Sequence, residues 1–318
     1  MGHVLRARAL RRTLGCGTFN AVIPFFFFLF GICIGSFLNV CISRIPEGVS
    51  IVSPGSRCPQ CLKPIKPYDN VPILGWLWLR GKCRNCRLPI SPMYPIIEFL
   101  TGAMFVLTYY TYDVTLATFK FLILGCLLII LIVTDLRVRM LPDAINWPGL
   151  GVGLAFSVKV PPSDGIAAAL FQRSDLLQPP TAVLGLIDAL LGAALGSLLL
   201  WSAAYLYKLV RKREGMGMGD VKMMAMVGAF LGVRGAFLTI LLGTLLGSIV
   251  GLTLVGALYA FGWKKKVAER AYRRGLGEVS ALRWTIASQY QLPFGTFLGI
   301  AAFLVVYAVP WILPRILG

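Results

Sequence analysis

Two aspartates lie at the edges of apolar runs, where an ionisable side chain is unusual and calls for a structural or functional explanation. Asp135 follows "LLIILIVT", and Asp220 ends "GMGMGD", just before "VKMMAMVGAFLG"; only 13 of the 318 residues are acidic. Two carboxylates held close together cannot both ionise readily, so one can stay protonated while the other acts as a base on water. The only histidine is His3, which excludes a Ser-His-Asp site and a His-ligated catalytic metal. The remaining chemistry is that of paired carboxylates, as in aspartic proteases.

Each acid also has an ordinary structural explanation. Asp135 lies beside two arginines and could form an interfacial ion pair, and Asp220 could be a turn residue or a helix cap. Asp143, after "LP", is interpreted as a helix N-cap or a supporting acid, and Asp188, in "GLIDALLG", as a packing or topology residue. Glu98, in "YPIIEFLTG", is either a binding acid or a structural partner of the basic loop before it.

Four of the eight cysteines form two C-x2-C pairs, "CPQC" at Cys58 and Cys61 and "CRNC" at Cys83 and Cys86. Two such turns, separated by 21 residues, suit tetrahedral Zn²⁺. Disulfides or redox motifs are the alternative, but stable disulfides are rare in the cytoplasm. Because four thiolates fill the coordination shell, we expect a structural Zn²⁺ and not a catalytic one.

The elements that must position these residues are membrane helices. The chain is 57% hydrophobic and 14% charged, with a mean hydropathy of +0.77, and several apolar runs approach the roughly 20 residues that cross a bilayer. We therefore expect an all-α polytopic membrane protein with about eight transmembrane helices, the first being retained and not cleaved as a signal peptide. The expected spans are residues 20–43, 96–112, 117–134, 145–160, 181–209, 221–233, 235–262 and 293–314. The glycines at 192, 196, 228, 232, 243, 247 and 251 are interpreted as serving close helix packing.

The net charge of +18 is explained by topology. If residues 44–95 are cytoplasmic and the spans alternate, 22 of the 31 Lys and Arg residues fall on the cytoplasmic side, as the positive-inside rule requires. Nucleic acid is therefore not an expected partner, whereas anionic lipid headgroups of the membrane are. In this orientation Asp135 and Asp220 lie at the same, cytoplasmic, face of the membrane.

Several motifs occur in an order that resembles the type IV prepilin peptidases. They are "GSFLNVCISRIPEG" (35–48), the "CPQC…CRNC" loop, "NVPILGWLWLRGKCRNCRLPISPMYPIIEFLTG" (70–102), "TDLRVRMLPD" (134–143), "GMGMGDVKMMAMVGAFLG" (215–232) and "PFGTFLG" (293–299). The resemblance implies a GxGD-type aspartic endopeptidase of the bacterial inner membrane, serving type IV pili or type II secretion. Such enzymes cleave the leader of prepilins or pseudopilins after a glycine, and many N-methylate the new terminus with S-adenosylmethionine. By this resemblance Asp135 and Asp220 are the catalytic acids.

The resemblance divides the chain into four parts: a first transmembrane helix (20–43), a cytoplasmic zinc-binding module (44–95), a membrane peptidase core (96–262), and a basic cytoplasmic loop with the last transmembrane helix (263–318). No residue is assigned to S-adenosylmethionine, because a strand-flanked G-x-G-x-x-G is absent from the sequence. Three alternatives stay open: a peptidase without methylation, a proton-coupled transporter that uses the acids as a relay, and a non-enzymatic assembly protein.

Overall fold

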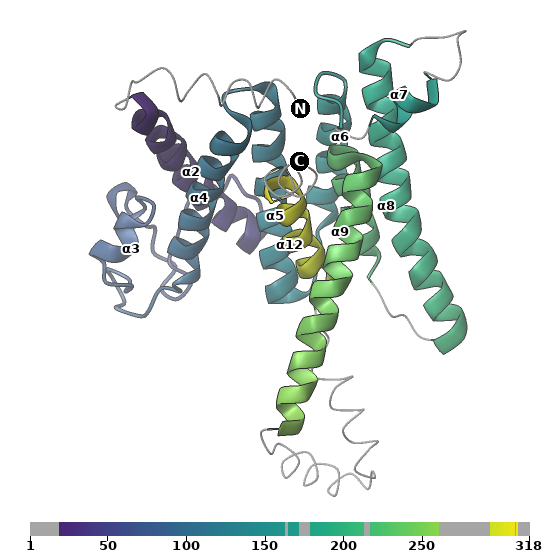
Figure 1. Ribbon diagram of the computed structural model, residues 1–318. Coiled ribbons are helices and arrows are strands. Elements are labelled where there is room, and N and C mark those ends of the chain that lie inside the picture. Colours follow the sequence, from purple (N-terminus) through teal and green to yellow (C-terminus); the bar gives the residue numbers. More distant parts are fainter. Residues whose placement is uncertain are drawn as a thin grey trace, which may run out of the picture.

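The computed structural model describes residues 19–162, 165–171, 179–212, 217–260, 293–308 and 310, and this part of the chain is helical, with no strand. The all-α fold class is confirmed for these residues. In chain order, the elements are α2 (Phe19–Arg44), the 3-10 helix η1 (Pro67–Asp69), α3 (Leu74–Trp78), α4 (Met93–Tyr112), α5 (Leu116–Val138), α6 (Asp143–Ser157), α7 (Ile166–Phe171), α8 (Thr181–Arg211), α9 (Met218–Ala260) and α12 (Phe294–Tyr307) (Figure 1).

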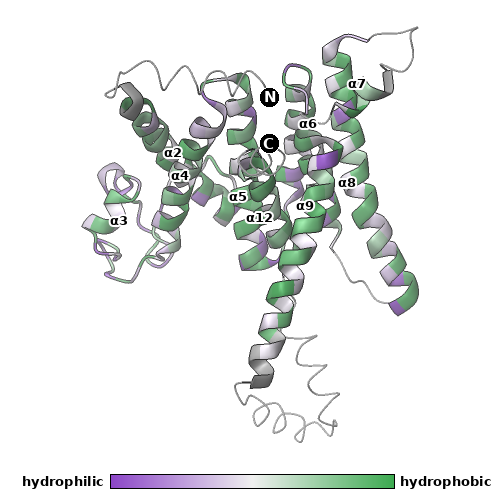
Figure 2. Cartoon of the chain, viewed as in Figure 1, coloured by the Kyte–Doolittle hydropathy of each residue, from purple (hydrophilic) through white to green (hydrophobic). Residues whose placement is uncertain are grey.

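Hydrophobic residues predominate along the long helices, as expected of a multi-pass membrane protein (Figure 2). Four helical segments of the described residues are long and apolar enough to cross a membrane: Val22–Arg44, Leu116–Val138, Thr181–Arg211 and Met218–Leu254, the last of which is interrupted at Gly232. Every predicted span overlaps a helix, but α6 and α12 have only 15 and 14 residues, so the count of eight spans is not confirmed. Residues 311–314 of the last predicted span lie outside the described residues.

Helix α9 is two antiparallel arms joined at Gly232, whose backbone is not helical (φ 77°, ψ −171°). A Cβ on Gly196 of α8 would lie 2.7 Å from the Met224 oxygen and 3.6 Å from the Ala236 Cβ. In a straight helix these 12 residues would span about 18 Å, so the chain must reverse between them. The first arm (218–231) and the second arm (233–260) correspond to the separate spans predicted at 221–233 and 235–262.

Glycines bring α8 and the first arm of α9 into backbone contact. A Cβ on Gly228 would lie 2.1 Å from the Gly192 oxygen, and a Cβ on Gly192 would lie 2.4 Å from the Gly228 oxygen. The prediction of close helix packing is therefore confirmed for Gly192, Gly196 and Gly228, whereas Gly232 is the residue at which α9 reverses. On its other side, the first arm meets α6, where a Cβ on Gly153 would lie 2.7 Å from the Phe230 ring.

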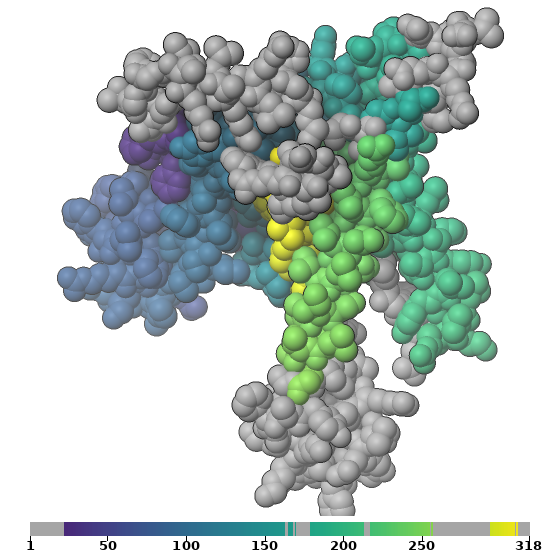
Figure 3. Space-filling model, viewed as in Figure 1, coloured from purple at the N-terminus to yellow at the C-terminus, as the bar shows by residue number. Residues whose placement is uncertain are grey.

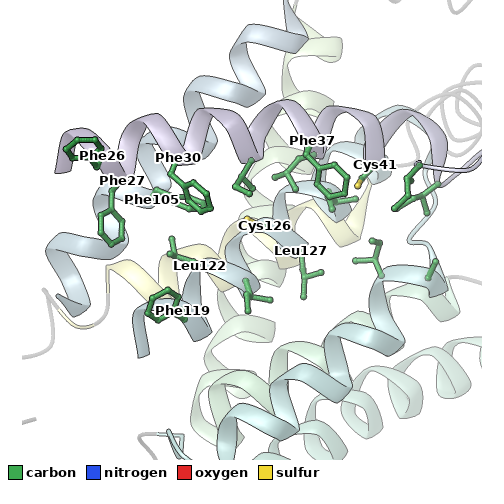
Figure 4. Close-up of a pocket in the computed structure, with 18 of the residues that line it drawn as sticks. Phe26, Phe27, Phe30, Phe37, Cys41, Phe105, Phe119, Leu122, Cys126 and Leu127 are labelled. Atoms are coloured by element: carbon green, nitrogen blue, oxygen red, sulfur yellow. The ribbon is translucent and has the colours of Figure 1, made fainter. Parts of the chain in front are cut away.

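An apolar groove of about 1060 Å³ runs between α2 and α5 (Figure 4). Phe30 and Phe37 of α2 line one side, and Leu122 and Cys126 of α5 line the other. Cys126 precedes Asp135 by nine residues, which is two and a half helical turns. The groove therefore lies on the opposite face of α5 from that acid.

Candidate active site and metal centre

Asp135 lies in the last turn of α5, a helix that is almost entirely apolar before it. The helix begins with a capping box formed by Thr115 and Thr118, and it ends where Arg139 adopts the left-handed conformation (φ 54°, ψ 41°). The Asp135 side chain is directed into the bundle and is only 6% exposed. The carboxylate is therefore available only to groups that neighbouring helices bring to it.

Asp220 lies in the first turn of α9 and is also buried, at 7% exposure. Its N–H donates to the Gly217 carbonyl at 3.2 Å. A Cβ on Gly219 would lie 2.9 Å from the Leu141 Cβ, so a glycine is needed there for the α5–α6 loop to approach. Gly217 has only ordinary contacts, the nearest being Asp220 Oδ2 at 3.7 Å. Of these two glycines, only Gly219 is required by close packing.

The first turn of α12 joins the two acids into one site. Thr296 donates to Asp135 Oδ2 twice, from its backbone N–H at 2.6 Å and from its hydroxyl at 2.9 Å. An ideal Cβ on Gly295 would lie 2.9 Å from Asp220 Oδ1 and 3.1 Å from Asp135 Oδ2. These two carboxylate oxygens are therefore separated by no more than the sum of the two distances, about 6 Å. In Figure 3, α12 lies directly against the second arm of α9, where a Cβ on Gly243 would lie 2.9 Å from Leu298 Cδ2.

The other predicted acids lie elsewhere. Asp143 is the first residue of α6 and not its N-cap, which is Pro142, so the N-cap interpretation was wrong; its carboxylate instead accepts hydrogen bonds from Lys222 at 2.8 and 2.6 Å. Asp188 accepts the Ala167 N–H at 2.7 Å and is 2% exposed, which fits a packing role.

Glu98 has a structural partner in the module between α2 and α4. Its Oε2 accepts the Ile73 N–H at 2.7 Å, where Ile73 has a positive φ of 61°. Nearby, the Asn39 side-chain amide of α2 donates to the Tyr94 carbonyl of α4 at 3.1 Å. Of the two interpretations of Glu98, the structural one agrees with these contacts.

The four paired cysteines meet in one cluster. Their Sγ atoms all lie within 4.8 Å of one another, and Cys58 Sγ and Cys86 Sγ are 3.9 Å apart. A tetrahedral site with Zn–S bonds of about 2.3 Å requires sulfur atoms about 3.8 Å apart, so the geometry fits Zn²⁺. Hydrogen bonds from the Cys86 and Asn85 N–H groups lower the pKa of the Cys83 thiol to about 6, whereas burial and the neighbouring thiols raise the pKa of the Cys86 thiol to about 11. Without a metal, the cluster therefore favours one thiolate and not four.

The two C-x2-C turns have the same backbone conformation. Cys58 and Cys83 each accept a hydrogen bond four residues on, from Leu62 and Arg87, and both of these donors have a positive φ, of 57° and 60°. Between the turns, Arg84 forms a two-pronged ion pair with Asp69 at 2.8 and 2.6 Å and lowers the pKa of that carboxyl. The four thiols thus bring two turns of the same backbone conformation together around one possible metal position.

Sequence reasoning did not assign roles to Gly295 and Thr296. The only signal was the motif "PFGTFLG", which belongs to the resemblance but contains no ionisable residue. Thr296 is 161 residues from the acid that it contacts.

Two family models match the chain. They are the Bacterial Peptidase A24 N-terminal domain over residues 29–112 and the Type IV leader peptidase family over residues 122–252.

Relatives named prepilin leader peptidase/N-methyltransferase cover most of the chain. The protein of Aeromonas hydrophila is 36% identical over 252 residues, which is 72% of this chain and 80% of the relative. That of Klebsiella pneumoniae is 37% identical over 236 residues, 71% of this chain and 94% of the relative. That of Neisseria gonorrhoeae is 33% identical over 259 residues, 73% of this chain and 83% of the relative. No solved structure matches the chain.

Proposed function

The chain belongs to the type IV leader peptidase family, and from this premise we propose that it is a membrane aspartic endopeptidase that cleaves the leaders of prepilins or pseudopilins after a glycine. The observation that carries the proposal is the convergence of Asp135 and Asp220, two buried carboxylates from different helices, on Gly295. A separation of at most about 6 Å allows both carboxylates to contact one water and one peptide group.

The proposed reaction is general acid–base hydrolysis. One carboxylate takes a proton from water as the water attacks the peptide carbonyl carbon, and the other, protonated, carboxyl donates its proton to the carbonyl oxygen. When the C–N bond breaks, the first carboxyl passes its proton to the leaving amine and the second takes one back from the tetrahedral diol. The dyad thus returns to its starting state without a covalent intermediate.

We also propose that the enzyme methylates the new N-terminal amine with S-adenosylmethionine. The relatives carry both activities in their name, which supports this second step. No residue of the described chain is assigned to the methyl donor.

The cysteine cluster is proposed to hold one structural Zn²⁺. Its four Sγ donors complete a tetrahedral shell, and the module around them has almost no other core. The metal would fix the two turns and would take no part in hydrolysis.

The active site is proposed to face the cytoplasm from the bacterial inner membrane. Arg137 and Arg139 follow Asp135, and Lys208, Arg211 and Lys212 end α8 shortly before Asp220 in the chain. Basic residues of this kind accumulate on the cytoplasmic side of a membrane protein. Both acids then face the side on which a prepilin leader would emerge.

The proposal is tested by Asp135→Asn and Asp220→Asn, with mass spectrometry of the pilin N-terminus. Asn has nearly the shape of Asp but cannot exchange the required protons, so each variant should lose cleavage by several orders of magnitude. Asp143→Asn is the matched control and should retain cleavage, because its carboxylate contacts Lys222 outside the dyad.

Zinc content and melting temperature should be unchanged in all three variants. Methylation of a pre-cleaved pilin should persist in Asp220→Asn, since methyl transfer needs no dyad. Rapid cleavage by either dyad variant would contradict the proposed mechanism. If the protein were a transporter or a non-enzymatic assembly protein, the wild type would not cleave prepilins either.

A further inference from the structure

We propose that the first turn of α12 is a third component of the active site, in which Thr296 holds Asp135 as the base and Gly295 keeps open the space between the carboxylates. This inference rests on the proposed peptidase function, because it assigns roles within that reaction. Thr296 is a positioning residue, since it acts through Asp135.

The hydrogen bonds of Thr296 determine where a proton of the dyad can lie. A backbone N–H can only donate, so Asp135 Oδ2, which accepts it at 2.6 Å, carries no proton. The Thr296 hydroxyl donates to the same oxygen at 2.9 Å, and Thr296 is 4% exposed, so bulk water does not replace it. Two donors to one oxygen favour the ionised form of Asp135 over its protonated form, so the proton that the reaction requires is assigned to Asp220, whose Oδ1 would lie 2.9 Å from a Cβ on Gly295.

The position of Thr296 in its helix strengthens this contact. Thr296 is the third residue of α12, whose N-cap is Pro293, and the N–H groups of a first turn have no partner within the helix. The positive end of the helix dipole also favours an anionic group at this position. The Asp135 carboxylate therefore supplies the acceptor that α12 lacks, while α12 fixes the orientation of the carboxylate.

Gly295 is required for a steric reason. A Cβ at this position would lie 2.9 Å from Asp220 Oδ1, 3.1 Å from Asp135 Oδ2 and 2.8 Å from Leu141 Cδ1. Such a methyl group would lie closer to both carboxylate oxygens than an ordinary contact and would occupy space that the attacking water needs. Only glycine leaves that space to the reactants.

These contacts assign the direction of proton transfer. Asp135 takes the proton from water while the hydroxide adds to the carbonyl carbon, and Asp220 protonates the carbonyl oxygen. When the C–N bond breaks, Asp135 gives its proton to the leaving amine, and Asp220 recovers one from the diol. Every proton is accounted for within the two carboxyls, the water and the peptide.

The test compares Thr296→Val, Thr296→Ser and Thr239→Val in the purified full-length protein, measuring kcat/KM for prepilin cleavage against pH. Valine has the shape of threonine without the hydroxyl, whereas serine keeps the hydroxyl. Thr239 is the control, because it is equally buried but its hydroxyl bonds only to the Gly235 carbonyl of its own helix.

Thr296→Val should lower kcat/KM at least about tenfold and move the acid limb of the profile about one pH unit upward, because Asp135 loses a donor to its ionised form. Thr296→Ser and Thr239→Val should follow the wild-type profile. A Thr296→Val profile with an unmoved acid limb would overturn the positioning role. Such a result would leave the proposed function standing, provided that Asp220→Asn is inactive.

Gly295→Ala tests the steric part separately. Cleavage should fall about 100-fold or more, since displacement of reacting groups by about 1 Å costs this much, while zinc content and melting temperature should stay near wild-type values. Wild-type cleavage by Gly295→Ala would overturn this part of the inference. If this variant fails to fold, the Thr296 series still decides the role of the helix.

Discussion

Removal of Zn²⁺ is expected to unfold the 44–95 module and to leave the helical bundle folded. Figure 1 shows this module, with α3 at its edge, beside the lower ends of α2 and α4. From residue 44 to residue 95, only Cys58, Gly75, Gly81 and Cys83 are buried. Apart from Cys58 and Cys83, therefore, no residue of the module with an apolar side chain is fully buried.

The magnitudes show why the metal should decide the outcome. Ordering one residue costs about 1–2 kcal/mol of backbone entropy, and burying one apolar side chain returns only about 1.5–3 kcal/mol. The module has no such buried side chain beyond its thiols, whereas a structural zinc site contributes about 10–16 kcal/mol. The contacts that remain are the Asp69–Arg84 ion pair and the Glu98 hydrogen bond to Ile73, each worth about 3 kcal/mol or less. These contacts cannot order the module alone.

The assay is hydrogen–deuterium exchange on purified protein before and after chelation, together with metal analysis. The native protein should hold about one Zn²⁺ per chain, and chelation should expose the amides of residues 50–90 while those of α5 and the first arm of α9 stay protected. Cys86→Ser should reproduce the chelated pattern, and Cys33→Ser, which changes an exposed cysteine of α2, should not. An absence of zinc from reduced, folded protein, or unchanged exchange after chelation, would refute the reasoning.

Three further predictions follow from the packing, the charges and the topology. Gly228→Ala should destabilise the protein by about 1–3 kcal/mol in thermal unfolding, because its Cβ would lie 2.1 Å from the Gly192 oxygen, whereas Gly151→Ala, with nothing within 4 Å, should be neutral. Arg84 lowers the pKa of Asp69, so their ion pair should stabilise the module at neutral pH, and this stabilisation should be lost as the pH falls through the acid range. Hydrogen exchange of the module should show this loss in the wild type and not in Asp69→Asn. Reporters fused within 44–95 and 211–220 should score cytoplasmic and those within 161–180 extracytoplasmic; opposite results for the first two would separate the acids.

The helices and the cysteine cluster could be predicted because their signals are local. Runs of apolar residues fix helices such as α5, and two C-x2-C turns bring their own thiolates together. Even the reversal at Gly232 could be predicted, since two consecutive apolar segments were separated at that position. Local signals of this kind can be recognised in the sequence without any knowledge of the tertiary structure.

The third component of the site could not be predicted, because it depends on packing alone. Thr296 is a neutral residue in an apolar helix, and nothing in its spacing points to an acid 161 residues earlier. The ion pair of Asp143 with Lys222 was missed for the same reason, as the two are 79 residues apart. The number of spans was also uncertain from sequence, since α6 and α12 are too short to be recognised by length.

The depth of the dyad constrains the way a substrate must approach it. Gly196 of α8 contacts Met224 of the antiparallel first arm, so Asp220, one turn earlier in α9, lies level with about residue 200 of α8. Helix α8 continues to Arg211, about 16 Å beyond that level. The residues of this extension are almost all exposed, and they include Trp201, Leu206 and Val210, which are apolar side chains suited to hydrocarbon.

The extension therefore places an exposed apolar helix face beyond the level of the two proposed catalytic acids, while the charged Arg137, Arg139 and Lys222 lie close to them in the chain. A segment already anchored in the bilayer by an apolar helix could lie along this face and present its end to the acids. This arrangement favours membrane-anchored precursors as substrates, and detachment of the apolar helix from a prepilin should strongly reduce cleavage even when the leader and the scissile bond are intact.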